Sequence, residues 1–161
     1  MQSAHIILCL LLAVSCGCRS EHSTHRSDGE MIQVFQNHQT EFEKLLAMFK
    51  ADKGLLYFSN GHTRPEDPQS VGITADRLKE YQTLFSRLGL DGIGDISQSG
   101  SKDEVWFFTS VEGSRPSTFK HYAHVMQPTR GIVEDLDQGA SKSAPYRLIE
   151  GYWYLALDDA D

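Results

Sequence analysis

The stretch Glu104-Val105-Trp106-Phe107-Phe108-Thr109 places large apolar side chains at successive positions. Neighbouring side chains of a β-strand point to opposite faces of its sheet, so both faces of this strand are apolar. A strand of this kind belongs in the middle of a sheet, and we expect helices to cover one of its faces.

Similar segments on either side of this strand are rich in aromatic or β-branched residues and are separated by turn residues. They cover residues 92–97, 118–126, 146–149 and 152–157, and the central strand itself extends over 104–111. Glu150-Gly151 suits a tight hairpin turn between the last two. We predict four or five mainly antiparallel strands, with a further short strand at 55–58.

Ser27 begins a segment with the pattern of an amphipathic helix. Ser27 and Glu30 have the spacing of a capping box, and apolar residues then recur at steps of three and four as far as Phe49. We expect this helix to end near residues 53–54. Its aromatic stripe also fits a membrane surface, but acidic rather than basic charges on its polar side favour packing against a core.

A second helix is predicted after Thr74, which has the position of an N-cap, with Leu78 placed to pack against the residue that precedes the cap. Gly89 ends this helix in the manner of a Schellman turn. The segment 59–72 is rich in Gly, Pro, Asn and Asp, and we expect it to be a loop.

Helices in the first half and strands in the second half predict an α+β fold. We expect two helices of the N-terminal half to pack on a four- or five-stranded, mainly antiparallel sheet. Residues 30–161 are sufficient for a single domain with one core.

The first eighteen residues contain no Asp, Glu, Lys or Arg and include an apolar run from Ile6 to Val14. This run is too short to span a bilayer and is typical of an export signal. Leu12-Ala13-Val14-Ser15-Cys16 resembles a bacterial lipobox, in which the cysteine is diacylated and becomes the new N-terminus. The resemblance implies a signal peptide over 1–15 and a lipid anchor on Cys16, with Cys18 as the alternative.

A lipid anchor implies attachment to the cell envelope, and to the outer membrane if the cell is Gram-negative, because Asp follows neither candidate cysteine. Ordinary cleavage after Ser15 is the alternative and gives a soluble secreted protein. Residues 16–29 are polar, as expected of a lipidated tether between the anchor and the domain.

The domain also has a pattern similar to that of small proteobacterial lipoproteins of unknown function. The residues that carry this resemblance are mostly aromatic: Tyr81 to Leu90, Lys120, Tyr122, Tyr146-Arg147 and Trp153-Tyr154-Leu155. It implies the same compartment and names no activity.

The net charge of −7 and the cysteine positions limit the possible partners. All three cysteines precede Arg19, so the predicted domain contains no disulfide and no thiolate metal site. An acidic chain without a basic stripe argues against nucleic acid as a partner. The acidic charge suits a basic protein partner, although ordinary solvated faces also account for it.

No motif of a known catalytic site is present, so we assign no catalytic residue, no cofactor and no metal. His121 and His124 lie three positions apart on a predicted strand, so their side chains point to opposite faces and do not share a metal. The acidic run 134–137 lacks the spaced ligands and the glycine of a calcium loop, and we expect a solvated loop there.

Two long segments, 59–72 and 127–145, exceed the usual length of connections and are places where ligands are often bound. They contain His62, Arg64 and Arg130, which are our candidate contacts for an anionic ligand or an acidic partner.

Three functional hypotheses follow. The first is a lipid-anchored envelope protein with a non-enzymatic binding or accessory role toward another envelope protein. The second is an inhibitor or immunity protein that neutralises a basic toxin or wall hydrolase. The third is an enzyme whose site combines His62, His121 or His124 with carboxylates of the long loops.

Overall fold

The computed structural model describes residues 25–95, 103–109, 118–137 and 145–159. Its helices are α1 (Asp28–Asn37), α2 (Gln39–Ala51), the short 3-10 helix η1 (Pro68–Val71) and α3 (Ala75–Leu88). Its strands are β1 (Tyr57–Ser59), β2 (His62–Arg64), β3 (Leu90–Asp95), β4 (Glu104–Thr109), β5 (Thr118–Val125), β6 (Tyr146–Glu150) and β7 (Trp153–Asp159). The predicted leader, both candidate anchor cysteines and residues 96–97 and 110–111 of two predicted strands lie outside the described residues.

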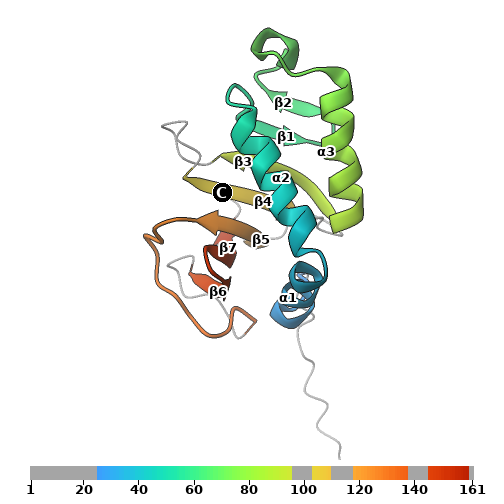
Figure 1. Cartoon of the computed structure of the whole chain (residues 1–161). Coiled ribbons are helices and arrows are strands. Elements are labelled where there is room, and N and C mark those ends of the chain that lie inside the picture. Colours follow the sequence, from blue (N-terminus) through green and yellow to red (C-terminus); the bar gives the residue numbers. More distant parts are fainter. Residues whose placement is uncertain (1–24, 96–102, 110–117, 138–144, 160–161) are drawn as a thin grey trace, which may run out of the picture.

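The strands form one antiparallel sheet in the order β2-β1-β3-β4-β5-β7-β6 (Figure 1). The fourth place in this order belongs to β4, which confirms it as a central strand. The α+β prediction is therefore confirmed, but the described residues form a sheet of seven strands and not of four or five.

The predicted loop over 59–72 is wrong in its first part, because β1 and β2 form a hairpin there. Asn60 and Gly61 connect the two strands with positive φ angles of 40° and 87°. Positive φ at both central residues gives a turn whose twist matches that of the strands, and Asn-Gly is the dipeptide that adopts it most readily. The Asn60-Gly61 dipeptide therefore indicates a hairpin, although the polar composition of the segment favours a loop.

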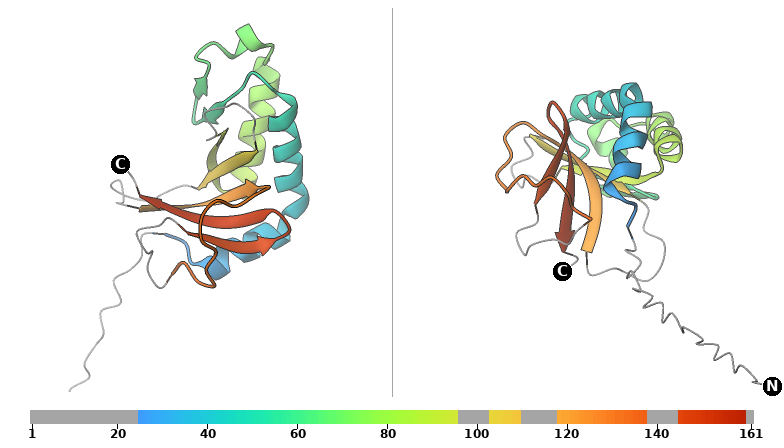
Figure 2. Two further views of the ribbon diagram at one scale, coloured as in Figure 1. Left: turned by 90° about the vertical axis from the view of Figure 1, so that its left-hand side faces the viewer. Right: turned by 90° about the horizontal axis from the view of Figure 1, so that it is seen from below.

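All three α-helices lie on one face of the sheet, which we call the helix face (Figure 2). Val105 and Phe107 of β4 point to this face and belong to the main core with residues of every α-helix. Trp106 and Phe108 point to the other face, where a second apolar cluster forms from strand residues alone. We call this second side the helix-free face.

The first predicted helix is interrupted at His38, which ends α1 and precedes α2. The apolar stripe continues through the break, since Phe35 and Phe42 both contact Trp153, with ring centroids 5.1 and 5.7 Å apart. Periodicity records which side chains are buried and does not record a change in axis between two short helices.

The predicted helix caps are confirmed. Ser27 and Glu30 form a reciprocal capping box at the start of α1. Thr74 accepts a hydrogen bond from the N–H of Arg77, and Gly89 ends α3 in the left-handed conformation with φ 65°. Among the described residues, no helix has both the length and the apolar character needed to cross a membrane.

Candidate functional site

His62 and Arg64 lie on β2, at one edge of the sheet, where both are exposed. Arg130 belongs to the connection between β5 and β6 and contacts β7 and β6, at the opposite end of the strand order from β2. The three predicted ligand contacts therefore do not form one site.

Arg130 lies over the helix-free face, where its guanidinium group is bound by residues of three strands. Its Nη1 atom donates to both carboxylate oxygens of Asp158 in β7, at 2.7 and 2.9 Å. The guanidinium carbon also lies 5.4 Å from the ring centroid of Trp106 in β4 and 5.4 Å from that of Tyr146 in β6. Both distances are within the range of a cation–π interaction. We call Trp106, Tyr146 and Asp158 together the guanidinium site.

Glu104 fixes the two aromatic rings of the guanidinium site. Its Oε1 atom accepts a hydrogen bond from the indole N–H of Trp106 at 2.7 Å and another from the hydroxyl of Tyr146. Burial and the hydrogen bond to Glu104 together raise the pKa of Tyr146, so the phenol stays neutral. The rings are thus held in place before any ligand binds.

His121 lies beside this site and is fully buried. Its ring is 4.1 Å from that of Trp106, tilted by 31°, and its Nε2 atom is 3.6 Å from the nearer oxygen of Asp158. Within the described part of the chain, neither of its ring nitrogens has a hydrogen-bond partner. Burial, followed by the charge of Arg130, lowers the pKa of His121 to about 3 and keeps the ring neutral at pH 7.

A buried polar atom without a hydrogen bond costs about 1–3 kcal/mol, and such atoms call for an explanation in a native structure. The sequence suggests His121 as a possible metal ligand or as part of an enzyme site, and neither interpretation connects it with Trp106. The available signal was alternation, because Trp106 and His121 both lie on the helix-free face of neighbouring strands.

His124 faces the other way, as the strand spacing predicted. It contacts Trp153 on the helix face, with ring centroids 5.2 Å apart, and burial lowers its pKa. With His62 at the β2 edge and His121 on the helix-free face, the three histidines of the enzyme hypothesis lie in three separate places. The convergence that would favour this hypothesis is therefore not found among them.

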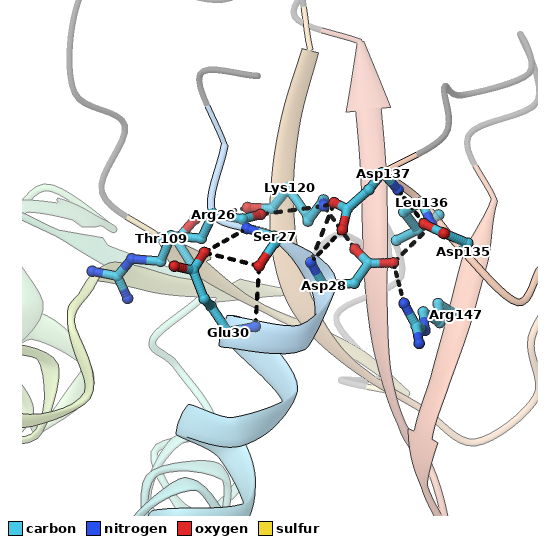
Figure 3. A network of polar contacts seen from close by, with 10 residues as sticks. All are labelled: Arg26, Ser27, Asp28, Glu30, Thr109, Lys120, Asp135, Leu136, Asp137 and Arg147. Carbon is cyan, nitrogen blue, oxygen red and sulfur yellow. Dashed lines mark hydrogen bonds and ion pairs between the residues drawn. The ribbon is translucent and has the colours of Figure 1, made fainter. Parts of the chain in front are cut away.

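A second polar cluster lies where α1 meets the sheet (Figure 3). The ammonium group of Lys120, which is 3% exposed, donates to Asp28 Oδ1 at 2.7 Å and to Asp137 Oδ1 at 2.5 Å. The other oxygen of Asp28 accepts from Arg147 at 2.6 Å and from the backbone N–H of Leu136 at 2.7 Å. Burial raises the pKa of Asp28, but the hydrogen bonds together lower it by more than burial raises it. The pKa of Asp28 is therefore below its ordinary value.

Oxygen atoms of Asp28, Asp135 and Asp137 lie within 4.8 Å of one another, a spacing that would suit a metal ion. Lys120 donates to two of these carboxylates and so supplies positive charge to the same place. The solvated loop that we expected at 134–137 is wrong in part, because Leu136 is buried and Asp137 bonds to Lys120. The cluster therefore links α1, β5, β6 and the segment that follows β5. We call Asp28, Lys120, Asp137 and Arg147 together the Lys120 joint.

Comparison with known proteins does not assign a role to this site. No protein-family model, no curated protein and no solved structure matches the chain. Two aromatic rings and a carboxylate around a guanidinium group are the chemistry of cation recognition. Within the chain, Arg130 forms an ion pair with Asp158, and its predicted contact with an anionic ligand stays a prediction.

Proposed function

We propose that this chain is a lipid-anchored protein of the cell envelope that binds another protein and catalyses no reaction. The lipobox-like stretch ending at Cys16 and the confinement of all three cysteines to the first eighteen residues support the anchor. The polar segment that follows has the composition of a tether.

One observation carries the binding role, which is the preformed guanidinium site on the helix-free face. Trp106 and Tyr146 are held by Glu104, and Asp158 adds a negative charge beside them. Rigid aromatic side chains next to a charged group are typical of the residues that contribute most to protein interfaces.

The joint at Asp28 is compatible with an anchored domain. The polar segment leads into α1, which begins at Asp28, two residues before the predicted end of the tether, and Asp28 is bonded to Lys120 of β5. The start of the domain is thus attached to the sheet as well as to its own helix.

The anchor is tested by labelling cells that express the protein with a clickable fatty acid. We expect label on the wild-type protein and on Cys18→Ala, and none on Cys16→Ala. Label lost only in Cys18→Ala would move the anchor to Cys18. A wild-type protein without label would contradict the anchored form and favour a secreted one.

A further inference from the structure

We propose that the guanidinium site is a receptor for an arginine side chain of a basic protein partner, and that Arg130 occupies it as an internal ligand which the partner displaces. The proposal rests on the binding role proposed above and adds the chemistry of the partner. It has three supports in the structure, which are the charge of the site, its unsatisfied polar atom and the place of Arg130 in the chain.

The charge of the site favours a cation. Two carboxylates lie at the site, because Glu104 accepts hydrogen bonds from both rings and Asp158 binds the guanidinium group of Arg130. A guanidinium group at this place is attracted by these carboxylates and by the two aromatic faces, whichever chain supplies it. The same carboxylates repel an anionic ligand, so the site favours a cation over an anion.

The unsatisfied atom is on His121. A neutral imidazole has one ring nitrogen that accepts a hydrogen bond. Burial keeps His121 neutral at pH 7, and the backbone of Phe119 has only a small opposing effect on its pKa. Among the described residues, neither ring nitrogen has a partner at good hydrogen-bond geometry. A guanidinium group carries more N–H donors than one carboxylate accepts. The Nε2 atom of His121 is 3.6 Å from the nearer oxygen of Asp158. We therefore expect an arginine that binds Asp158 at a different angle from Arg130 to direct a spare donor to His121.

The place of Arg130 in the chain permits the exchange. It belongs to the connection after β5 and to no strand, and its side chain is 25% exposed. Residues 126–129 before it are exposed as well. Its side chain can leave the site for solvent while the antiparallel pairing of β4, β5 and β7 stays intact. The net charge of −7 attracts a basic partner over longer distances.

The experiment uses the full-length protein, purified in detergent, and its variant Arg130→Ala. The probes are N-acetyl-arginine amide and, as a neutral control, N-acetyl-glutamine amide, with binding measured by calorimetry. We expect Arg130→Ala to bind the arginine probe at least tenfold more tightly than the wild-type protein does, and neither protein to bind the glutamine probe. Adding Asp158→Asn to Arg130→Ala should abolish the gain.

Arg64→Ala is the matched control, because it removes the same charge from an exposed position on β2. We expect it to bind the arginine probe as the wild-type protein does. Equal gains in Arg64→Ala and Arg130→Ala would reduce the effect to net charge and overturn the proposal. No gain in a folded Arg130→Ala protein would also overturn it.

A measurement on the wild-type protein covers the case in which Arg130→Ala does not fold. A tetra-arginine peptide is titrated while the side-chain NMR signal of Arg130 is followed. We expect this signal to move to the position of a solvated arginine as the peptide saturates, and an unchanged signal at saturation would contradict the proposal. Fatty-acid labelling is independent of these results, so a failure of the anchor and a failure of the arginine site are distinguishable.

Discussion

Arg130 and His121 show how the meaning of a single residue depends on its neighbours. Arg130 is an ordinary loop arginine in the sequence, yet in the structure its charge is bound by Asp158 and two aromatic rings. His121 differs from Arg130 because its polar atoms are buried without a hydrogen bond among the described residues, although the sequence shows only a polar residue on a predicted strand. Both groups depend on Trp106, which contacts them from the neighbouring strand.

His121 makes the stability of the protein depend on pH. Its pKa is about 3 in the folded protein, against 6.5 for an ordinary histidine, so between these pH values the unfolded chain binds a proton that the folded chain does not. Stability therefore falls as the pH drops from 6.5 toward 3, by up to about 1.4 kcal/mol per pH unit from this group. The measurement is urea unfolding of the wild-type protein and His121→Phe between pH 7 and pH 4.

His121→Phe removes both the titrating group and the unsatisfied nitrogens. We expect the free energy of unfolding of His121→Phe at pH 7 to be higher than that of the wild-type protein by up to about 1 kcal/mol. We also expect it to fall less steeply as the pH is lowered. Equal slopes in the two proteins would show that His121 does not titrate as described.

At the scale of elements, helix ends were predicted more reliably than strand number. Caps at Ser27, Thr74 and Gly89 are confirmed because each rests on a side chain or conformation within a few residues of the helix end. The break at His38 and the hairpin of β1 and β2 were missed. Both are changes of direction inside a continuous pattern of burial or polarity, and such patterns do not encode direction.

The N-cap of α3 provides a test of this local reasoning. Thr74→Ala removes the side-chain oxygen that accepts from the N–H of Arg77 at 3.1 Å, and we expect it to cost about 1 kcal/mol. Thr83→Ala, an exposed position in the same helix, is the control and should change stability by less than about 0.5 kcal/mol. Urea unfolding of both variants decides, and equal losses would speak against the cap.

For the molecule as a whole, the Lys120 joint connects parts of the chain that are far apart in sequence. Asp28 begins α1, Asp137 follows β5 in the chain, and Arg147 belongs to β6. A buried ammonium group with two carboxylate partners is stable only while all three remain in place.

Lys120→Met tests the joint. The substitution keeps much of the side-chain volume but leaves the buried carboxylate of Asp28 with less compensation, so we expect a loss of about 3 kcal/mol. Lys79→Met, at an exposed position of α3, should change stability by less than about 0.5 kcal/mol. Thermal unfolding gives both values, and a Lys120→Met protein as stable as Lys79→Met would refute the structural role of the joint.

The sequence by itself determined the α+β class, the central strand β4, the helix caps and the opposite orientation of His121 and His124. Each of these follows from chemistry within a few residues, through capping hydrogen bonds, periodic burial or the alternation of a strand. Only the tertiary structure decided that Lys120 meets Asp28 and that Arg130 occupies a site made by three strands. Those contacts depend on strand order and register, which are settled by packing the whole sheet against its helices and have no local signature in the chain.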